Sequence, residues 1–189
     1  MATTLPLTLL GTALRWRRAG QRWSVANARQ LQAPETVLVE SSSFGPGGAI
    51  PFSHAGAGVG ANSSPALAFS NLPDATAQLL LVIEDIDVPM ARPLLHTIAL
   101  IDAGLTDLAE GALDHSTTAI RFVPAAFGRS GYQGPRALPG HGPHRYGFHV
   151  FALDRAIPKD AALADFAELL PWVDGQVLAH GTLVGTQQR

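Results

Sequence analysis

The sequence predicts a mainly β domain, an antiparallel β-sandwich with short helices near its C-terminal end. Short apolar or alternating segments recur along most of the chain, whereas helical periodicity is confined to the region after Pro158. Strands and helices do not alternate as they would in a parallel α/β fold. The 19 glycines, the 14 prolines and a charged fraction of only 15% are also typical of a compact β-rich domain rather than a helical bundle.

Length, charge and cysteine content narrow the class of protein. The 189 residues suffice for one domain with a substantial core. The absence of cysteine excludes disulfides, thiolate nucleophiles and sulfur metal sites, and it fits a reducing cytoplasm. The formal net charge of −2 gives no sign of the positive surface that would bind nucleic acid or an anionic membrane. We therefore expect a cytoplasmic protein without a nucleic-acid partner or an integral membrane segment.

Residues 35–189 are expected to form the main domain, after an unassigned N-terminal arm or edge strand at residues 1–34. Residues 5–14 are apolar, and the arginines of residues 15–18 follow them. A secretory signal has the opposite order, with its positive charge first. A segment this short cannot span a bilayer, which takes about 20 residues. We interpret it as an early strand or arm, with an interfacial anchor as the alternative.

Five further segments have the composition of strands: 36–40, 65–69, 78–84, 94–101 and 146–153. The continuous apolar run of 78–84 predicts burial on both faces, as in the centre of a sandwich. Residues 146–153 alternate instead, which places Tyr146, Phe148, Val150 and Ala152 on one face. The Ser-, Gly- and Pro-rich segment 41–65 is expected to be a long irregular loop of the functional kind.

Two helices are predicted after the last of these strands. Residues 159–170 carry apolar positions at helical spacing, and Pro171 is expected to end this helix. Residues 172–180 could form a second short helix, with Gly181 as its stop.

Acidic residues gather at the end of the strand 78–84. Because side chains alternate along a strand, Asp85 and Asp87 should point to one side and Glu84 to the other. Two carboxylates on one side repel unless a cation, an imidazole or an ammonium lies between them. The alternative is simply a solvated strand end. Pro89 would make the following turn rigid, and a cis Val88–Pro89 bond is one way to do so.

Two histidines and a tyrosine are the other candidate site residues. His96 lies within an apolar strand, where a histidine is more often a core residue with its hydrogen bonds satisfied internally than a ligand-binding one. The acids precede it by about the length of a hairpin, however, which could bring them next to it. The Gly- and Pro-dense loop 128–143 opens into a strand that begins with His144 and Tyr146, which would present an imidazole and a phenol to one side. Such a loop is typical of the entrance to a ligand-binding pocket.

Five short motifs occur in order along the chain: Asn62-Ser-Ser-Pro-Ala-Leu67, Asp85-Ile-Asp-Val-Pro89, His96, Gly131-Tyr-Gln-Gly-Pro135 and Gly142-Pro-His-Arg-Tyr-Gly-Phe148. Each motif alone is unspecific, but the five in this order and spacing are specific. With them, the chain resembles the bacterial and archaeal branch of the phosphatidylethanolamine-binding, or Raf-kinase-inhibitor-like, family. The resemblance covers about residues 37–185.

The resemblance implies a β-sandwich with Greek-key connections and a small pocket at one end. That pocket binds phosphate, acetate or phospholipid head groups without a cofactor or metal, and relatives often form homodimers. Carried over by motif, the ligand-binding residues are Asp85, Asp87, His96, Gly134, Pro135, His144 and Tyr146.

The chain departs from the family pattern at three places. Ile86 stands between the two aspartates where the family usually has proline, and Thr97 follows the strand histidine where an aromatic residue is usual. Ala137 and Leu138 replace two common prolines of the loop. Arg136, just before them, could add a guanidinium to the mouth and favour an anionic ligand.

Binding without chemistry is therefore the leading hypothesis, with a regulatory role by analogy to kinase-regulating relatives. In this hypothesis Asp85 and Asp87 orient His96 and His144, which bind a small anionic or zwitterionic ligand. The alternative is a hydrolase or lyase that uses the same Asp–His cluster as acid and base, with Ser130 as the one loop serine near it. A metal site built from the four residues and a protein-interaction module are weaker alternatives.

Overall fold

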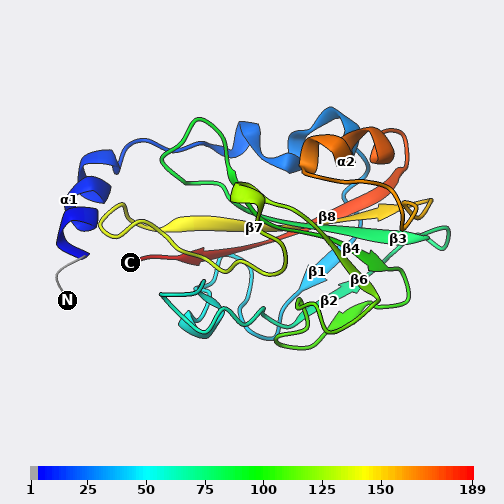
Figure 1. The fold of residues 1–189 in the computed structure, drawn as a ribbon, viewed down its shortest axis with the longest axis horizontal. Helices are drawn as coiled ribbons and strands as arrows, with labels where there is room; N and C mark the ends of the chain where they lie inside the picture. The colour runs from blue at the N-terminus through cyan, green and yellow to red at the C-terminus, as the bar shows by residue number, and fades with distance from the viewer. Residues whose placement is uncertain (1–3) are drawn as a thin grey trace.

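The computed structural model describes residues 4–189 and shows two antiparallel sheets packed face to face (Figure 1). The larger sheet has five strands in the order β6-β4-β3-β7-β8, and the smaller has three in the order β1-β2-β5. The strands are β1 (Leu38–Glu40), β2 (Leu67–Ser70), β3 (Gln78–Asp85), β4 (Leu94–Asp102), β5 (Asp107–Leu108), β6 (Ile120–Val123), β7 (His144–Leu153) and β8 (Val177–Gln187). The predicted mainly β sandwich is confirmed.

The large sheet is covered on both faces, which explains the continuous apolar run of its central strand. All eight residues of β3 are buried. Leu79, Leu81 and Ile83 of β3 and the even-numbered residues of β7 from Tyr146 to Ala152 face the small sheet in the main core. Leu80 and Phe151 face the other way, against the N-terminal segment and the C-terminal helix. The predicted alternation of residues 146–153 is confirmed.

The N-terminal segment is helical, so of the two expected forms, an arm or an edge strand, the edge strand is wrong. It contains α1 (Thr4–Leu14) and three 3-10 turns, η1 (Gln21–Trp23), η2 (Val25–Asn27) and η3 (Arg29–Leu31). Helix α1 packs on the loop before β7, where a Cβ at Gly11 would overlap the Pro139 carbonyl oxygen. Within residues 4–189, no helix is long and apolar enough to cross a membrane. The further turns η4 (Phe52–His54) and η5 (Ala126–Gly128) interrupt long loops.

The C-terminal region is another place where the prediction fails; strands β5 and β6 were also not predicted. Helix α2 (Phe166–Val173) begins later than predicted, at Asp165, whose carboxylate caps it by accepting a bond from Glu168 N at 3.0 Å. Pro171 lies inside α2 and does not end it. The predicted second helix is wrong, because its residues from Val177 onward belong to β8. That strand pairs with β7 and alternates buried with half-buried positions.

We expect Phe148→Ala to lower the free energy of unfolding by about 3–5 kcal/mol, because it empties a closed site in the main core. Phe148 is fully buried, and its ring centroid lies 5.4 Å from that of Phe44. Urea denaturation measures the loss. Phe52→Ala is the control, since Phe52 is 56% exposed and its loss should cost no more than about 0.5 kcal/mol. Equal losses in the two variants would contradict this account of the core.

Candidate ligand-binding site

The site is built where β3 ends, because consecutive residues there face opposite sides of the large sheet. Asp85 faces one side and Glu84 the other, and both are buried. His144 Nδ1 lies 2.7 Å from Asp85 Oδ2. The antiparallel register of β3 and β7 brings them together, because it pairs Asp85 with Tyr146, two residues from His144. The predicted approach of an aspartate and an imidazole from distant segments is therefore present.

A cavity of about 370 Å³ opens beside this pair. It is lined by Asp85, Val88, Pro89, Met90, Leu94, His96, Phe127, Arg129, Arg136, Leu138 and His144. Three of the seven predicted site residues, namely Asp85, His96 and His144, thus lie on one cavity wall. We call it the Asp85–His96 cavity.

His144 has both of its ring nitrogens occupied by other protein groups. Its Nε2 lies 2.7 Å from His141 Nδ1, and His141 Nε2 lies 3.0 Å from the Arg17 carbonyl oxygen. These contacts occupy both ring nitrogens of His144, so neither is free for a ligand.

His96 and Tyr146 provide the unsatisfied polar atoms of the site. His96 Nδ1 donates to the Gln133 carbonyl oxygen at 3.0 Å, while Nε2 is buried without a hydrogen-bond partner in the described chain. The Tyr146 hydroxyl lies beside Asp85 and likewise has no partner of ordinary geometry among residues 4–189. The two rings meet edge to face, with their centroids 5.5 Å apart. His96 lines the Asp85–His96 cavity, whereas Tyr146 is not among its lining residues and lies against His96 and Asp85.

Burial is the main cause of the pKa shifts of His96 and Tyr146. It lowers the pKa of His96 below its ordinary 6.5, against the opposing charge of Asp85. Burial, and next the Asp85 charge, raise the pKa of Tyr146 far above its ordinary value. At neutral pH the site therefore holds a neutral imidazole and a neutral phenol.

The expectation that Asp87 orients a histidine is wrong. The Asp87 carboxylate accepts two bonds from the Arg145 guanidinium, both at 2.8 Å, and lies 3.5 Å from Arg18 Nη1. Burial acts to raise the pKa of Asp87, but the bonds from Arg145 outweigh it and the net shift is downward. The Asp87 backbone N–H donates to Asp85 Oδ1 at 2.9 Å. Asp87 thus braces the turn behind the cavity.

Gly134 and Pro135 are buried behind the lining residues rather than on the cavity wall. Gly134 N donates to Asn62 Oδ1 at 2.9 Å, and a Cβ at this position would overlap the His54 carbonyl oxygen. The Pro135 carbonyl accepts from Gly56 N at 2.9 Å. Glycine is needed here for close backbone approach. The Val88–Pro89 bond is trans, so the cis interpretation is wrong.

The cavity mouth is cationic. Arg129 and Arg136 both line it, and neither forms an ion pair with a carboxylate of the described residues. Burial, and then the neighbouring Arg129 charge, lower the pKa of Arg136. The sequence had singled out Arg136 but missed Arg129 and His141, for which the only signals were the Gly-rich loop and the spacing His141-x-x-His144.

The geometry supports neither of the two chemical alternatives. Within residues 4–189, no group of three or more acidic or imidazole side chains is arranged to hold a metal ion. Asp87 is bound to Arg145, and His96 Nδ1 to a backbone carbonyl. Ser130 is exposed in its loop and does not line the cavity, so it is not placed next to a general base.

Comparison with known proteins agrees with the fold and the motifs. The profile of the family described as "Phosphatidylethanolamine-binding protein" matches residues 40–188. A UPF0098 protein of Pyrococcus horikoshii is 34% identical over 156 residues, covering 80% of this chain and 77% of the relative. A UPF0098 protein of Chlamydia muridarum is 34% identical over 158 residues, covering 81% of this chain and 99% of the relative.

Solved structures agree as well. A putative phosphatidylethanolamine-binding protein homologue from Chlamydia trachomatis superposes with a TM-score of 0.72 at 29% identity, covering 82% of this chain and 99% of the other. YbcL of Escherichia coli, described as a new member of the mammalian family, superposes with a TM-score of 0.73 at 25% identity and the same coverage. The family is known for binding small ligands or anions. The chain belongs to the phosphatidylethanolamine-binding protein family.

Proposed function

We propose that the protein binds a small anionic or zwitterionic molecule, a phosphate, carboxylate or phospholipid head group, in the Asp85–His96 cavity. The observation that carries the proposal is the buried, unpartnered Nε2 of His96, which lines the cavity. The Tyr146 hydroxyl, whose ring packs against His96, is also unpartnered. An unpaired buried polar group costs about 1–3 kcal/mol. A ligand that supplies the missing partners recovers this free energy on binding.

His96 is the group that recognises an anion. Because its Nδ1 donates to the Gln133 carbonyl, a neutral ring carries its proton there and leaves Nε2 as an acceptor. Nε2 can donate to an anionic oxygen only when the ring is protonated. Arg129 and Arg136 add positive charge at the mouth. An ammonium group of a zwitterion would bind on the Asp85 side of the cavity.

This assignment changes the role that the sequence suggested for His144. The bonds to Asp85 and His141 keep both nitrogens of His144 occupied. Its contribution is to hydrogen-bond the buried Asp85 carboxylate and hold it in position. Loss of His144 would therefore act on the cavity through Asp85 rather than through a lost ligand contact.

Anion affinity should rise as pH falls, because burial holds the pKa of free His96 below 6.5 and a bound anion raises it. Between those two values the affinity should increase by up to about tenfold per pH unit. Calorimetry with sulfate, which does not titrate in this range, from pH 8 to pH 5 measures the slope. Phosphorylethanolamine in the same series tests whether an ammonium adds affinity.

The variant His96→Gln should remove this slope and weaken sulfate binding about tenfold or more at pH 5. His180→Gln is the matched control, since His180 lies on β8 and bonds the Ala33 carbonyl instead. Sulfate binding that is independent of pH, or a slope that survives in His96→Gln, would refute the role of His96.

Tyr146→Phe should separate stability from binding. Removing a buried hydroxyl that has no partner should leave the free energy of unfolding unchanged or raise it by up to about 1 kcal/mol. The same change should weaken phosphorylethanolamine binding, because the ligand loses a hydrogen bond. Thermal unfolding and calorimetry on one preparation measure both. Destabilisation of about 1 kcal/mol or more would mean that the hydroxyl already has a partner in the free protein.

A further inference from the structure

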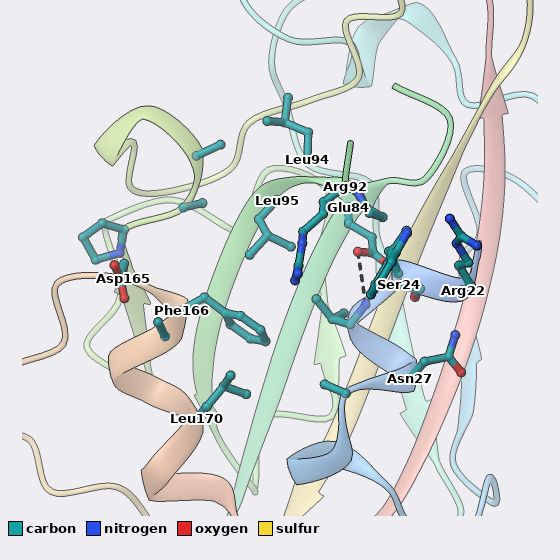
Figure 2. Close-up of a pocket in the computed structure, with 18 residues that line it drawn as sticks. Arg22, Ser24, Asn27, Glu84, Arg92, Leu94, Leu95, Asp165, Phe166 and Leu170 are labelled. Atoms are coloured by element: carbon teal, nitrogen blue, oxygen red, sulfur yellow. Dashed lines mark hydrogen bonds between the residues drawn. The ribbon is translucent and has the colours of Figure 1, made fainter. Parts of the chain in front are cut away.

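A second and larger hollow lies on the opposite face of the same strand ends. It has a volume of about 690 Å³ and runs between the N-terminal segment and α2, across β3 and β4 (Figure 2). Asp85 and His96 line the first cavity, whereas their neighbours Glu84 and Leu95 line this groove. The two hollows therefore lie on the two sides of one sheet, and Leu94 alone among residues 4–189 lines both.

The middle of the groove is apolar. Figure 2 shows Leu95, Phe166 and Leu170 facing the space between the sheet and α2. Val25 and Ala28 complete the wall on the N-terminal side. These side chains belong to or pack against the apolar cluster on this face of the sheet. Hollows of this size with mostly apolar walls are typical of small-molecule sites.

One end of the groove carries two uncompensated positive charges. The guanidinium groups of Arg22 and Arg92 lie 5.2 and 5.0 Å from the ring centroid of Trp23. Both arginines line the groove, and neither pairs with a carboxylate anywhere in residues 4–189. Both guanidinium groups are exposed beside the same indole, so each can donate hydrogen bonds to a carboxylate that enters the groove.

The acids of the groove do not neutralise this charge. Glu84 is fully buried, and its carboxylate accepts bonds from the Ser24 hydroxyl, Val25 N and His149 Nε2. Asp165 lies at the N-terminus of α2, across the groove from Arg22 in Figure 2, and caps the helix. The layout is therefore a cationic end followed by an apolar channel.

We propose that this groove binds an acyl carboxylate, with the carboxylate on Arg22 and Arg92 and the chain along Leu95, Phe166 and Leu170. An unbranched acyl chain suits the channel because its middle offers apolar side chains and its one buried acid is already satisfied. Planar guanidinium groups bind a carboxylate in bidentate fashion. The site goes beyond the proposed head-group binding, since it takes a different ligand on another face.

The test is calorimetric titration of the full chain with decanoate, below its micelle concentration, and with decanol and octanoate for comparison. Decanoate should bind at least tenfold more tightly than decanol, because only the carboxylate engages the arginines. Each added CH₂ should raise the affinity about fourfold. The double variant Arg22→Gln/Arg92→Gln should lose the preference for decanoate over decanol.

Arg15→Gln is the matched control, because Arg15 stacks on Trp16 at 4.8 Å in the same way but lies outside the groove. It should leave decanoate binding unchanged. Leu170→Glu, checked for folding by circular dichroism, should weaken decanoate by tenfold or more. Equal affinity for decanoate and decanol, equal losses in Arg15→Gln, or no loss in Leu170→Glu would overturn the proposal.

The two sites are distinguished by competition. Phosphorylethanolamine should not displace decanoate, and His96→Gln should bind decanoate normally. If decanoate is displaced, or is lost in His96→Gln, it binds in the Asp85–His96 cavity and the groove assignment fails. Absence of decanoate binding with normal sulfate binding would overturn the groove alone and leave the first site intact.

Discussion

Two consecutive buried carboxylates at the end of β3 are the constraint on which the rest of the structure depends. Glu84 and Asp85 face opposite sides of the sheet, and a buried, uncompensated carboxylate costs several kcal/mol. Strand β7 supplies one imidazole to each side, His149 to Glu84 at 3.0 Å and His144 to Asp85 at 2.7 Å. Because His144 and His149 are an odd number of residues apart on β7, their side chains point to opposite faces of the sheet, as those of Asp85 and Glu84 do. The register of β3 and β7 is thereby determined by charge as well as by apolar packing.

The N-terminal segment completes both of these clusters, although it lies outside the region that matches the family profile. Ser24 and the Val25 backbone N–H donate to Glu84 on one face. On the other, the Arg17 carbonyl accepts from His141 and ends the chain of bonds to Asp85. The segment is therefore part of the wall of the groove and part of the electrostatics of the cavity. Its attachment is polar at these two points, and Val25 and Leu31 add apolar packing against the sheet.

The central strands were predictable because burial on one or both faces leaves a direct apolar pattern, as in β3, β4 and β7. Strand β8 was not, since its half-buried alternating residues follow a true helix without a clear boundary. Asp85 and an imidazole could be paired from the sequence, but Asp87 could not be placed. Strand β3 ends at Asp85, so the period of two no longer applies to Asp87. The free Nε2 of His96 depends on tertiary contacts that carry no local signal.

Thr97 and Ile86, two of the residues that depart from the family pattern, form hydrogen bonds that position the residues around the Asp85–His96 cavity. Thr97 Oγ1 accepts from Gln133 N at 3.1 Å, while the preceding His96 donates to the Gln133 carbonyl at 3.0 Å. Thr97 and His96 of β4 thus bind the backbone N–H and the carbonyl of Gln133. The bond to the carbonyl fixes the proton of a neutral His96 ring on Nδ1. Ile86 N donates to the Arg145 carbonyl at 3.0 Å, a bond that proline could not make, and its own carbonyl accepts from Gly20 N. Since that last bond joins the N-terminal segment to the turn beside Asp85, Ile86 links this segment to the wall of the Asp85–His96 cavity.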